Sequence, residues 1–177
     1  MKSIFNLGGL SPKLIALLIL GGLSPFVRAA DPYVGYIYPA GIQAGNCVIT
    51  ESGALVGVVS EVGVNWATVS TVINTDIEMG GIVSRTFCAG ILEGDFALMA
   101  KNRLKLSYLP EGAQLVSGDA VVTSGKGDVY PSGLVVGQVE GVFTDPSGMT
   151  RYAVVIPDVA IDSLIEVFVV KEFDIIE

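Results

Sequence analysis

Short apolar stretches alternate with glycine, asparagine or aspartate through most of the chain. Stretches of this length with turn residues between them predict β-strands of a small barrel or sandwich. Only residues 159–166 indicate a helix, of one or two turns. The predicted strands are residues 47–50, 55–62, 67–73, 82–88, 104–109, 120–123, 134–143, 152–156 and 167–170. The fold class predicted from this pattern is all-β.

Part of the pattern occurs twice. Residues 45–50 (GNCVIT) align with residues 118–123 (GDAVVT), and residues 55–59 (LVGVV) align with residues 135–139 (VVGQV). Each copy predicts a strand, a glycine-rich turn and a second strand with an internal glycine, which suits a bulge or a tight bend. Chance likeness between two β-rich segments is the other explanation. A true repeat would favour two related barrels over one large sheet.

Composition and charge narrow the classes of function. Hydrophobic residues make up 51% of the 177 residues, which is ample for a core, and 22 glycines fit many tight turns. The net charge is −8 and there is no histidine. An acidic surface repels phosphate backbones, so a nucleic-acid partner is not expected.

The N-terminal thirty residues resemble a secretory signal. Lys2 and Lys13 precede an apolar run at residues 14–23, and small residues follow at 27–30 (VRAA). We expect a signal peptide at residues 1–29, cleavage after Ala29 or Ala30, and an exported protein. An uncleaved membrane anchor and a buried core helix are the alternatives, although the apolar run is short for a membrane span.

Export would place Cys47 and Cys88 in a potentially oxidising compartment, where they could form a disulfide. The interpretation we favour is two small buried residues in separate strands, because nothing in the sequence brings them together.

Several motifs in register resemble one known family. Residues 123–137 read TSGKGDVYPSGLVVG, residues 145–148 read DPSG, and residues 106–110 read LSYLP. Upstream, residues 55–59 read LVGVV and residues 74–76 read NTD. In this order and spacing they resemble the extracytoplasmic β-domain of the rod shape-determining protein family MreC, over residues 40–171.

The motif residues also have a plain structural interpretation. Glycines supply positive φ angles or close backbone approach, and a proline fixes a turn or begins a strand. A phosphate-binding loop is excluded, because Lys126 and Gly127 lack the required spacing and a following helix. The structural motif residues are Gly57, Gly125, Gly127, Pro131, Gly133, Gly137, Pro146 and Gly148.

The resemblance implies two small β-barrels, the first of them truncated. We expect a first, incomplete unit at residues 41–76, a second unit with closing strands at residues 77–171, and a tail at residues 172–177. The head at residues 30–40 does not resemble the family, and no coiled-coil heptads precede the β-domain. Residues 33–38 have the length and β-propensity of a surrogate strand for the first barrel.

Catalysis is not expected. Without histidine the chain can form neither a Ser-His-Asp nor a Cys-His site, and two distant cysteines cannot hold zinc. Ser124 and Lys126 would form a poor dyad, because nothing desolvates the lysine. Glu93 and Asp95 could bind calcium weakly, although a solvated turn is the favoured interpretation. We expect no enzyme, no metal and no cofactor.

The resemblance implies a scaffold of the bacterial cell-elongation machinery that organises peptidoglycan synthases outside the cytoplasmic membrane. Its implied partners are a class B penicillin-binding transpeptidase and an MreD-like membrane protein, with self-association. The alternative is a small secreted module that binds a wall glycan or peptide through Tyr33, Tyr36 and Tyr38.

Overall fold

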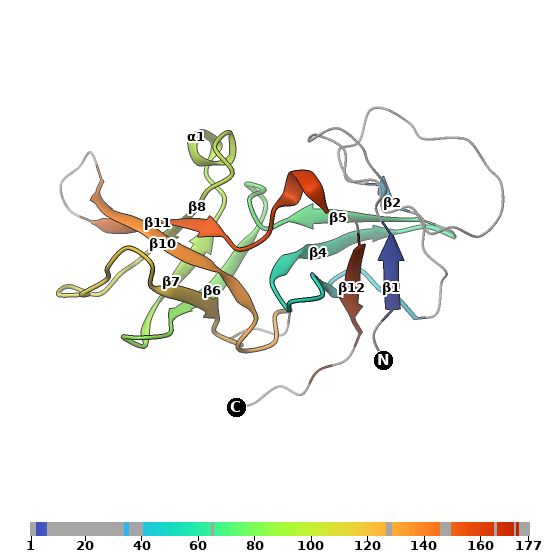
Figure 1. Cartoon of the computed structure of the whole chain (residues 1–177), viewed down its shortest axis with the longest axis horizontal. Coiled ribbons are helices and arrows are strands. Elements are labelled where there is room, and N and C mark those ends of the chain that lie inside the picture. The colour runs from blue at the N-terminus through green and yellow to red at the C-terminus, as the bar shows by residue number, and fades with distance from the viewer. Residues whose placement is uncertain are drawn as a thin grey trace. The chain divides into compact units, whose positions relative to one another are not determined.

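The computed structural model describes residues 3–6, 34–35, 41–64, 66–126, 129–145, 150–164, 166–171 and 173. They form two compact units, and nearly all of the regular structure is β-strand (Figure 1). The first unit comprises Met1–Ser52, Val56–Thr71 and Ala160–Glu172, and the second comprises Gly53–Leu55, Val72–Val159 and Phe173–Glu177. The all-β prediction is confirmed.

The first unit is a six-stranded sheet in the order β1-β12-β3-β4-β5-β2. Its strands are β1 (Ser3–Asn6), β2 (Val34–Gly35), β3 (Cys47–Ile49), β4 (Leu55–Val62), β5 (Ala67–Thr71) and β12 (Glu166–Val170). The C-terminal strand β12 pairs with β3, so the chain returns to the first unit at its end. The predicted division at residues 76 and 77 is therefore wrong for residues 160–171, because their pairing is with a strand far away in sequence.

The second unit is a closed six-stranded barrel in the order β10-β11-β8-β7-β6-β9. Its strands are β6 (Glu78–Val83), β7 (Cys88–Glu93), β8 (Leu104–Ser107), β9 (Ala120–Thr123), β10 (Val135–Thr144) and β11 (Arg151–Pro157). Neighbouring strands in this barrel are antiparallel. Leucine and valine side chains with no exposed surface fill its interior, including Val83, Leu92, Leu104, Leu106, Val121 and Val155.

Three local predictions need correction. The single strand expected at residues 82–88 is instead the end of β6, a turn and the first residue of β7, because the chain reverses before Phe87, whose φ is 53°. A helical turn that the pattern did not indicate, α1 (Phe96–Met99), follows Asp95, and the carboxylate of Asp95 caps it. The helix expected at residues 159–166 is only the short 3-10 turn η1 (Ile161–Ser163).

The repeat suggested by the sequence is present in the backbone hydrogen bonds. Gly45 N–H donates to the Val59 carbonyl, and Gly118 N–H donates to the Val139 carbonyl, both at 2.8 Å. Val59 and Val139 return equivalent bonds to the carbonyls of Asn46 and Asp119. A bulge interrupts the β4–β5 pairing just after Val59 and the β10–β11 pairing just after Val139. β3-β4-β5 and β9-β10-β11 are thus two copies of one structural element.

The match extends to the flanking strands. β12 pairs with β3 as β6 pairs with β9, and β2 pairs with β5 as β8 pairs with β11. β1 lies beside β12 as β7 lies beside β6 (Figure 1). The units differ in one step: β7 pairs with β8 and closes the barrel, whereas β1 and β2 stand at opposite ends of the first sheet. The described first unit is an open form of the barrel that the second unit closes.

Candidate functional site: the signature turn and the aromatic end of the second unit

The buried hydroxyl of Thr123 holds the turn that begins at the end of β9. This turn belongs to the motif at residues 123–137, and we call it the signature turn. Thr123 has no exposed surface, and its Oγ1 donates to the Pro131 carbonyl at 2.5 Å and accepts from the Leu134 N–H at 2.9 Å. Backbone bonds from Thr123 N–H to the Leu134 carbonyl and from Gly133 N–H to the Thr123 carbonyl join the same segments. One threonine therefore holds both ends of the turn.

The glycines of the motif meet two different needs. Gly125 and Gly133 have φ angles of 73° and 84°, which side-chain-bearing residues rarely adopt. Gly137 and Gly57 instead lie against neighbouring strands, where a Cβ would overlap the carbonyl oxygens of Ile156 and Ser70 respectively. Pro131 lies in the turn, while Gly127, Pro146 and Gly148 lie outside the described residues.

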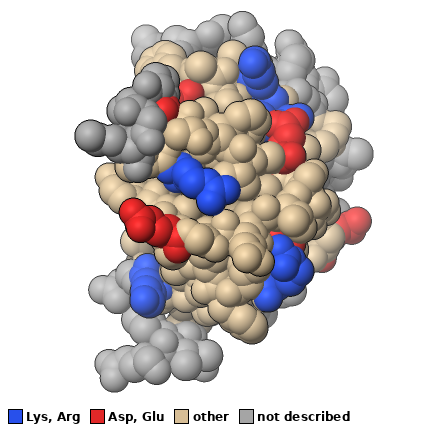
Figure 2. Space-filling view, turned by 90° about the vertical axis from the view of Figure 1, so that its left-hand side faces the viewer, with Lys and Arg blue, Asp and Glu red and all other residues tan. Residues whose placement is uncertain are grey.

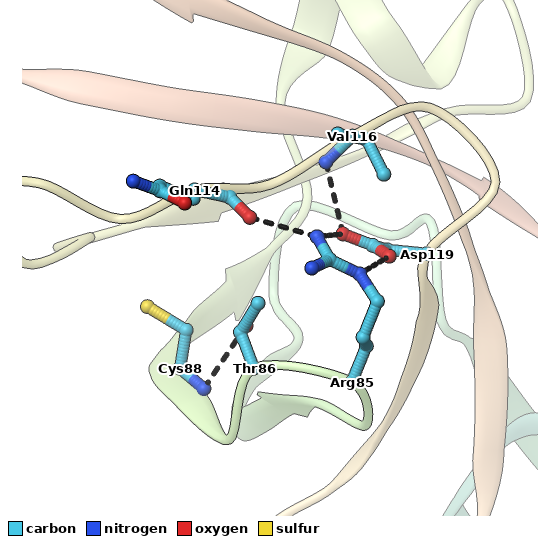
Figure 3. Close-up of polar contacts among 6 residues, drawn as sticks. All are labelled: Arg85, Thr86, Cys88, Gln114, Val116 and Asp119. Carbon is cyan, nitrogen blue, oxygen red and sulfur yellow. Dashed lines mark hydrogen bonds and ion pairs between the residues drawn. The ribbon is translucent and has the colours of Figure 1, made fainter.

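An ion pair joins the β6–β7 turn to the segment that precedes β9 (Figure 3). Arg85 donates from Nε to Asp119 Oδ1 at 2.6 Å and from Nη2 to Asp119 Oδ2 at 2.8 Å. Arg85 Nη2 also donates to the Gln114 carbonyl, and the Val116 N–H donates to Asp119 Oδ2. The Asp119 side chain is only 4% exposed, whereas that of Arg85 is 52% exposed. The forked geometry is the strong form of an arginine–carboxylate contact.

The pKa values of the pair shift as this contact requires. The hydrogen bond from Arg85 holds the pKa of Asp119 below its ordinary value, against the opposing effect of burial. The same hydrogen bond raises the pKa of Arg85.

In the first unit, Asn46 replaces the carboxylate: its Oδ1 accepts from the Gln43 N–H, as Asp119 accepts from Val116. The ion pair is therefore particular to the second unit.

Exposed apolar side chains gather at the same end of the barrel. Phe87 is 82% exposed and precedes β7, while Tyr108 is 77% exposed and follows β8. Ile91 of β7 pairs with Ser107 of β8, so both aromatic residues lie at one end of this strand pair. Val116, 55% exposed, is tied to the same end through Asp119 and Arg85. We call Phe87, Tyr108 and Val116 the aromatic end.

Phe87 and Tyr108 are also held in an unfavourable backbone conformation. Their φ angles are 53° and 56°, in the left-handed region that costs side-chain-bearing residues about 1–2 kcal/mol. Neither aromatic ring is buried in return. Strained residues with exposed apolar side chains are characteristic of binding sites.

The charges on the second unit are dispersed. On the face shown in Figure 2, basic side chains are spread out among acidic and uncharged ones and do not merge into one patch. On the outside of the barrel, Lys105 pairs with Glu93 at 3.2 Å and lies 5.4 Å from the centre of the Tyr152 ring.

The other candidate residues are not brought together. Cys47 lies in β3 of the first unit and Cys88 in β7 of the second, and no disulfide joins them. Cys47 is buried, which raises its pKa to about 12, whereas Cys88 is only half-buried, so the favoured interpretation of two buried residues holds for Cys47 alone. Both backbone bonds to Asp95 Oδ1 come from the start of α1, so this carboxylate has a capping role. Ser124 Oγ accepts from the backbone N–H of Lys126 within the turn.

Within the described residues, no group of three His, Cys, Asp or Glu side chains is placed to hold a metal ion. No helix among them is long and apolar enough to cross a membrane. The apolar run at residues 14–23 lies wholly outside the described residues, and of the expected signal peptide at residues 1–29 only β1 is described.

Sequence reasoning missed the aromatic end and the ion pair. In the sequence, Tyr108 belongs to the LSYLP motif, which does not indicate exposure, and nothing local marks Phe87 as exposed. The repeat offered one signal for the ion pair, since it aligned Asp119 with the uncharged Asn46. Its partner Arg85 lies 34 residues away in the sequence, and only the folding of the barrel brings the two side chains together.

The fold and its signature turn together define a duplicated β-domain whose second unit is a closed barrel. A family model described as "Rod shape-determining protein MreC, barrel core" matches residues 39–171. The cell shape-determining protein MreC of Listeria monocytogenes is 31% identical over 137 residues, which are 74% of this chain and 44% of that protein. The chain belongs to the MreC family. It spans less than half the length of the curated relatives from Listeria monocytogenes, Bacillus subtilis and Geobacillus stearothermophilus.

Two solved structures share the fold. MreC from Pseudomonas aeruginosa superimposes with a TM-score of 0.75 at 22% identity, covering 96% of this chain and 99% of that one. MreC from Helicobacter pylori, solved in complex with the penicillin-binding protein PBP2, has a TM-score of 0.53 at 15% identity, covering 82% of this chain and 83% of that one.

Proposed function

We propose that this chain is a non-catalytic scaffold of the bacterial cell-elongation machinery, which acts outside the cytoplasmic membrane and helps to organise peptidoglycan synthases. Membership of the MreC family supports the role in cell shape. The absence of histidine from the sequence leaves no general base of the kind that a Ser-His-Asp or Cys-His site needs.

The proposed partner is a class B penicillin-binding transpeptidase, with an MreD-like membrane protein as a further partner. A complex of a family member with PBP2 has been solved, which makes this class of enzyme the first candidate. The proposed contact is the aromatic end, because Phe87 and Tyr108 present large exposed rings that a partner could cover. Both residues have a strained positive φ angle, and burial of their rings within the chain does not compensate for that strain. This combination of exposure and strain is the observation that carries the proposal.

Replacing Phe87 and Tyr108 with glycine tests the contact without harming the fold. Glycine relieves the left-handed strain, so F87G/Y108G should melt at the same temperature as the wild type or higher. Immobilised wild-type protein should retain a transpeptidase from detergent-solubilised cell envelopes, detected by covalent labelling with fluorescent penicillin. The double variant should lose most of that signal.

Phe96 provides the matched control. It is 79% exposed but lies in α1, between the end of β7 and the start of β8, and so at the opposite end of this strand pair from Phe87. Phe96→Ser should therefore leave transpeptidase capture unchanged. Undiminished capture by F87G/Y108G would remove the aromatic end from the proposal. Retention of wall glycan without any transpeptidase would support the secreted binding module instead, although its tyrosines at positions 33, 36 and 38 lie outside the described residues.

A further inference from the structure

Arg85 uses only part of its hydrogen-bonding capacity inside the chain. A guanidinium group carries N–H donors on three nitrogens, with two of them on each Nη. Nε and Nη2 of Arg85 donate to Asp119, and Nη2 also donates to the Gln114 carbonyl at 2.8 Å. Among the described residues nothing accepts a hydrogen bond from Nη1, and no dashed line leaves that nitrogen in Figure 3. Both donors of Nη1 are therefore available to a partner.

A second forked arginine–carboxylate pair shows what full use of the guanidinium group looks like. Arg103 donates from Nε and Nη2 to the two carboxylate oxygens of Glu140, at 3.2 and 3.0 Å. Its Nη1 donates to the carbonyls of Lys101 and Asn102, both at 3.1 Å. The Arg103 side chain is 26% exposed, against 52% for Arg85. Arg103 thus uses all three nitrogens within the chain, whereas Arg85 keeps one for solvent or for a partner.

The available nitrogen belongs to the aromatic end. Arg85 and Phe87 lie in the same β6–β7 turn, and the Val116 N–H donates to the Asp119 carboxylate that holds Arg85. Because Asp119 is buried and bonded at both oxygens, it fixes the position of the guanidinium group before any partner arrives. A donor that is already held in place loses little conformational entropy on binding. Arginine among aromatic side chains is also characteristic of the residues that dominate protein interfaces.

We propose that Arg85 is a specificity-determining residue of the aromatic end, whose Nη1 donates to a carbonyl oxygen of the transpeptidase while Asp119 positions the guanidinium group. This inference rests on the proposed function and names the polar group that the partner must present. Asp119 already balances the charge of Arg85, so a carboxylate of the partner would be repelled by Asp119, whereas an uncharged carbonyl oxygen would not. The partner surface should therefore be apolar, with a carbonyl oxygen among its apolar groups.

The double variant R85M/D119N removes the donors without leaving a buried charge unpaired. Methionine keeps an apolar stem, and asparagine can accept from the Val116 N–H as Asn46 accepts from the Gln43 N–H in the first unit. The net charge of the protein does not change. Immobilised protein is titrated against detergent-solubilised cell envelopes, and the retained transpeptidase is detected with fluorescent penicillin. Half-maximal capture by R85M/D119N should require about ten times more protein than capture by the wild type.

R103M/E140Q is the matched control. It removes an equally forked pair that lies just before β8, at the opposite end of this strand from Tyr108. It should capture the transpeptidase like the wild type. An equal loss of capture in R103M/E140Q and R85M/D119N would overturn the proposal, because it would show that any such pair supports binding through the fold.

Arg85→Lys separates the donor from the charge. Lysine keeps a positive charge beside Asp119, so its urea midpoint should stay close to that of the wild type. Its single nitrogen replaces three, and pairing with Asp119 leaves none in the place of Nη1. R85K should therefore capture as poorly as R85M/D119N. Wild-type capture by either variant would overturn the proposal.

Salt tests the nature of the acceptor. The wild type and R85M/D119N have the same net charge, so the ratio of their affinities isolates the contact made by Arg85. That ratio should be equal at low and at high salt, because a bond to an uncharged carbonyl oxygen is not screened as an ion pair is. A ratio that falls as salt is raised would identify a carboxylate and overturn the assignment of a carbonyl oxygen.

These outcomes are separable from the test of the proposed function. If the wild type retains no transpeptidase, the proposed function fails and this inference fails with it. If F87G/Y108G loses capture while R85M/D119N keeps it, the aromatic end remains the contact and only the role of Arg85 is overturned.

Discussion

At the scale of single residues, the same residue type carries opposite energetic roles in the two units. Thr71 and Thr123 are both buried at the end of a strand. The Thr123 hydroxyl makes two hydrogen bonds, whereas the Thr71 hydroxyl has no hydrogen-bond partner among the described residues. A buried hydroxyl without a partner costs free energy, and one with two partners recovers that cost.

Valine substitutions at these positions should therefore change stability in opposite directions. Thr71→Val removes an unsatisfied group at nearly constant volume and should stabilise the protein by about 1 kcal/mol. Thr123→Val leaves the Leu134 N–H without its acceptor and should destabilise by about 1–3 kcal/mol. Urea unfolding of both variants measures the two values. Equal losses would show that the Thr71 hydroxyl is satisfied in solution.

Gly137 is fixed by contact with the neighbouring strand and not by its own φ angle. Gly137→Ala would push a Cβ into the Ile156 carbonyl and should destabilise by about 2–3 kcal/mol. Gly141→Ala in the same strand is the control. Its Cβ would lie 3.3 Å from the half-exposed Phe143 ring, which can move. The change in the free energy of unfolding should therefore stay within about 0.5 kcal/mol. Thermal and urea unfolding check both, and a wild-type melting curve for G137A would contradict the packing argument.

At the scale of elements, turns and strand ends are held by a few side chains from distant parts of the chain. Arg85 reaches from the β6–β7 turn to Asp119 before β9, and the Asp119 carboxylate in turn orders the backbone at Val116. The first unit achieves the same turn at Asn46 without charge. The ion pair therefore adds pH dependence to a turn that does not need it for its shape.

Acid should weaken the second unit through Asp119. Because its pKa is lowered by folding, the stabilisation is fully present above the ordinary aspartate pKa of about 3.9 and is lost as the pH falls through the lower folded value. Asp119→Asn should remove this part of the acid dependence, leaving a flatter profile of stability against pH below about pH 4. Urea midpoints across the acid range measure it. Asp158→Asn, at an exposed carboxylate of the same unit, should keep the wild-type slope, and an unchanged slope in D119N would exclude the ion pair as its source.

The surrogate-strand prediction has a specific observation behind it. Val34 pairs with Thr68 and Gly35 with Ala67, in the place that β8 takes beside β11, while the remainder of residues 33–38 lies outside the described residues. Val34→Pro removes a strand N–H and should deprotect the amides of Ala67 and Thr68 in hydrogen exchange. The amides of β9 in the second unit provide the internal control and should not change. Unaltered protection throughout would mean that the head contributes no strand to the first unit.

At the scale of the whole molecule, both units have the same arrangement of six strands, and the second unit closes it into a barrel. The closed copy carries the signature turn, the ion pair and the aromatic end, and the open copy depends on strands from the N-terminal segment. This difference makes processing of the N-terminus an event that matters for the fold.

Export should cut the chain after Ala29 or Ala30. Cleavage would remove Lys2, Lys13 and Arg28 but no acidic residue, so the released protein should be more acidic than the chain of net charge −8. Expression in a bacterium with a general secretion pathway, followed by mass spectrometry of the product, tests this. An intact N-terminus in the membrane fraction would instead identify the apolar run at residues 14–23 as an anchor.

The sequence by itself determined what depends on neighbouring residues. β4 and β9 begin and end where their apolar patterns do, and the described motif glycines lie where a positive φ or a close strand approach requires them: Gly57, Gly125, Gly133 and Gly137. The repeat was also visible in the sequence, because each copy needs the same turn and bulge glycines at the same spacing. Backbone sterics and the alternation of apolar and polar side chains along a strand depend only on residues close together in the chain. A single sequence therefore suffices to find them.

Only the tertiary structure decided the long-range pairings. The return of β12 to β3, the closure of β7 on β8, and the contact between Arg85 and Asp119 each join residues far apart in the chain. The exposure of Phe87 and Tyr108 follows from those pairings, because they set which ends of the strands face solvent. Register and closure depend on how side chains pack across strands, and that information is not contained in any local pattern.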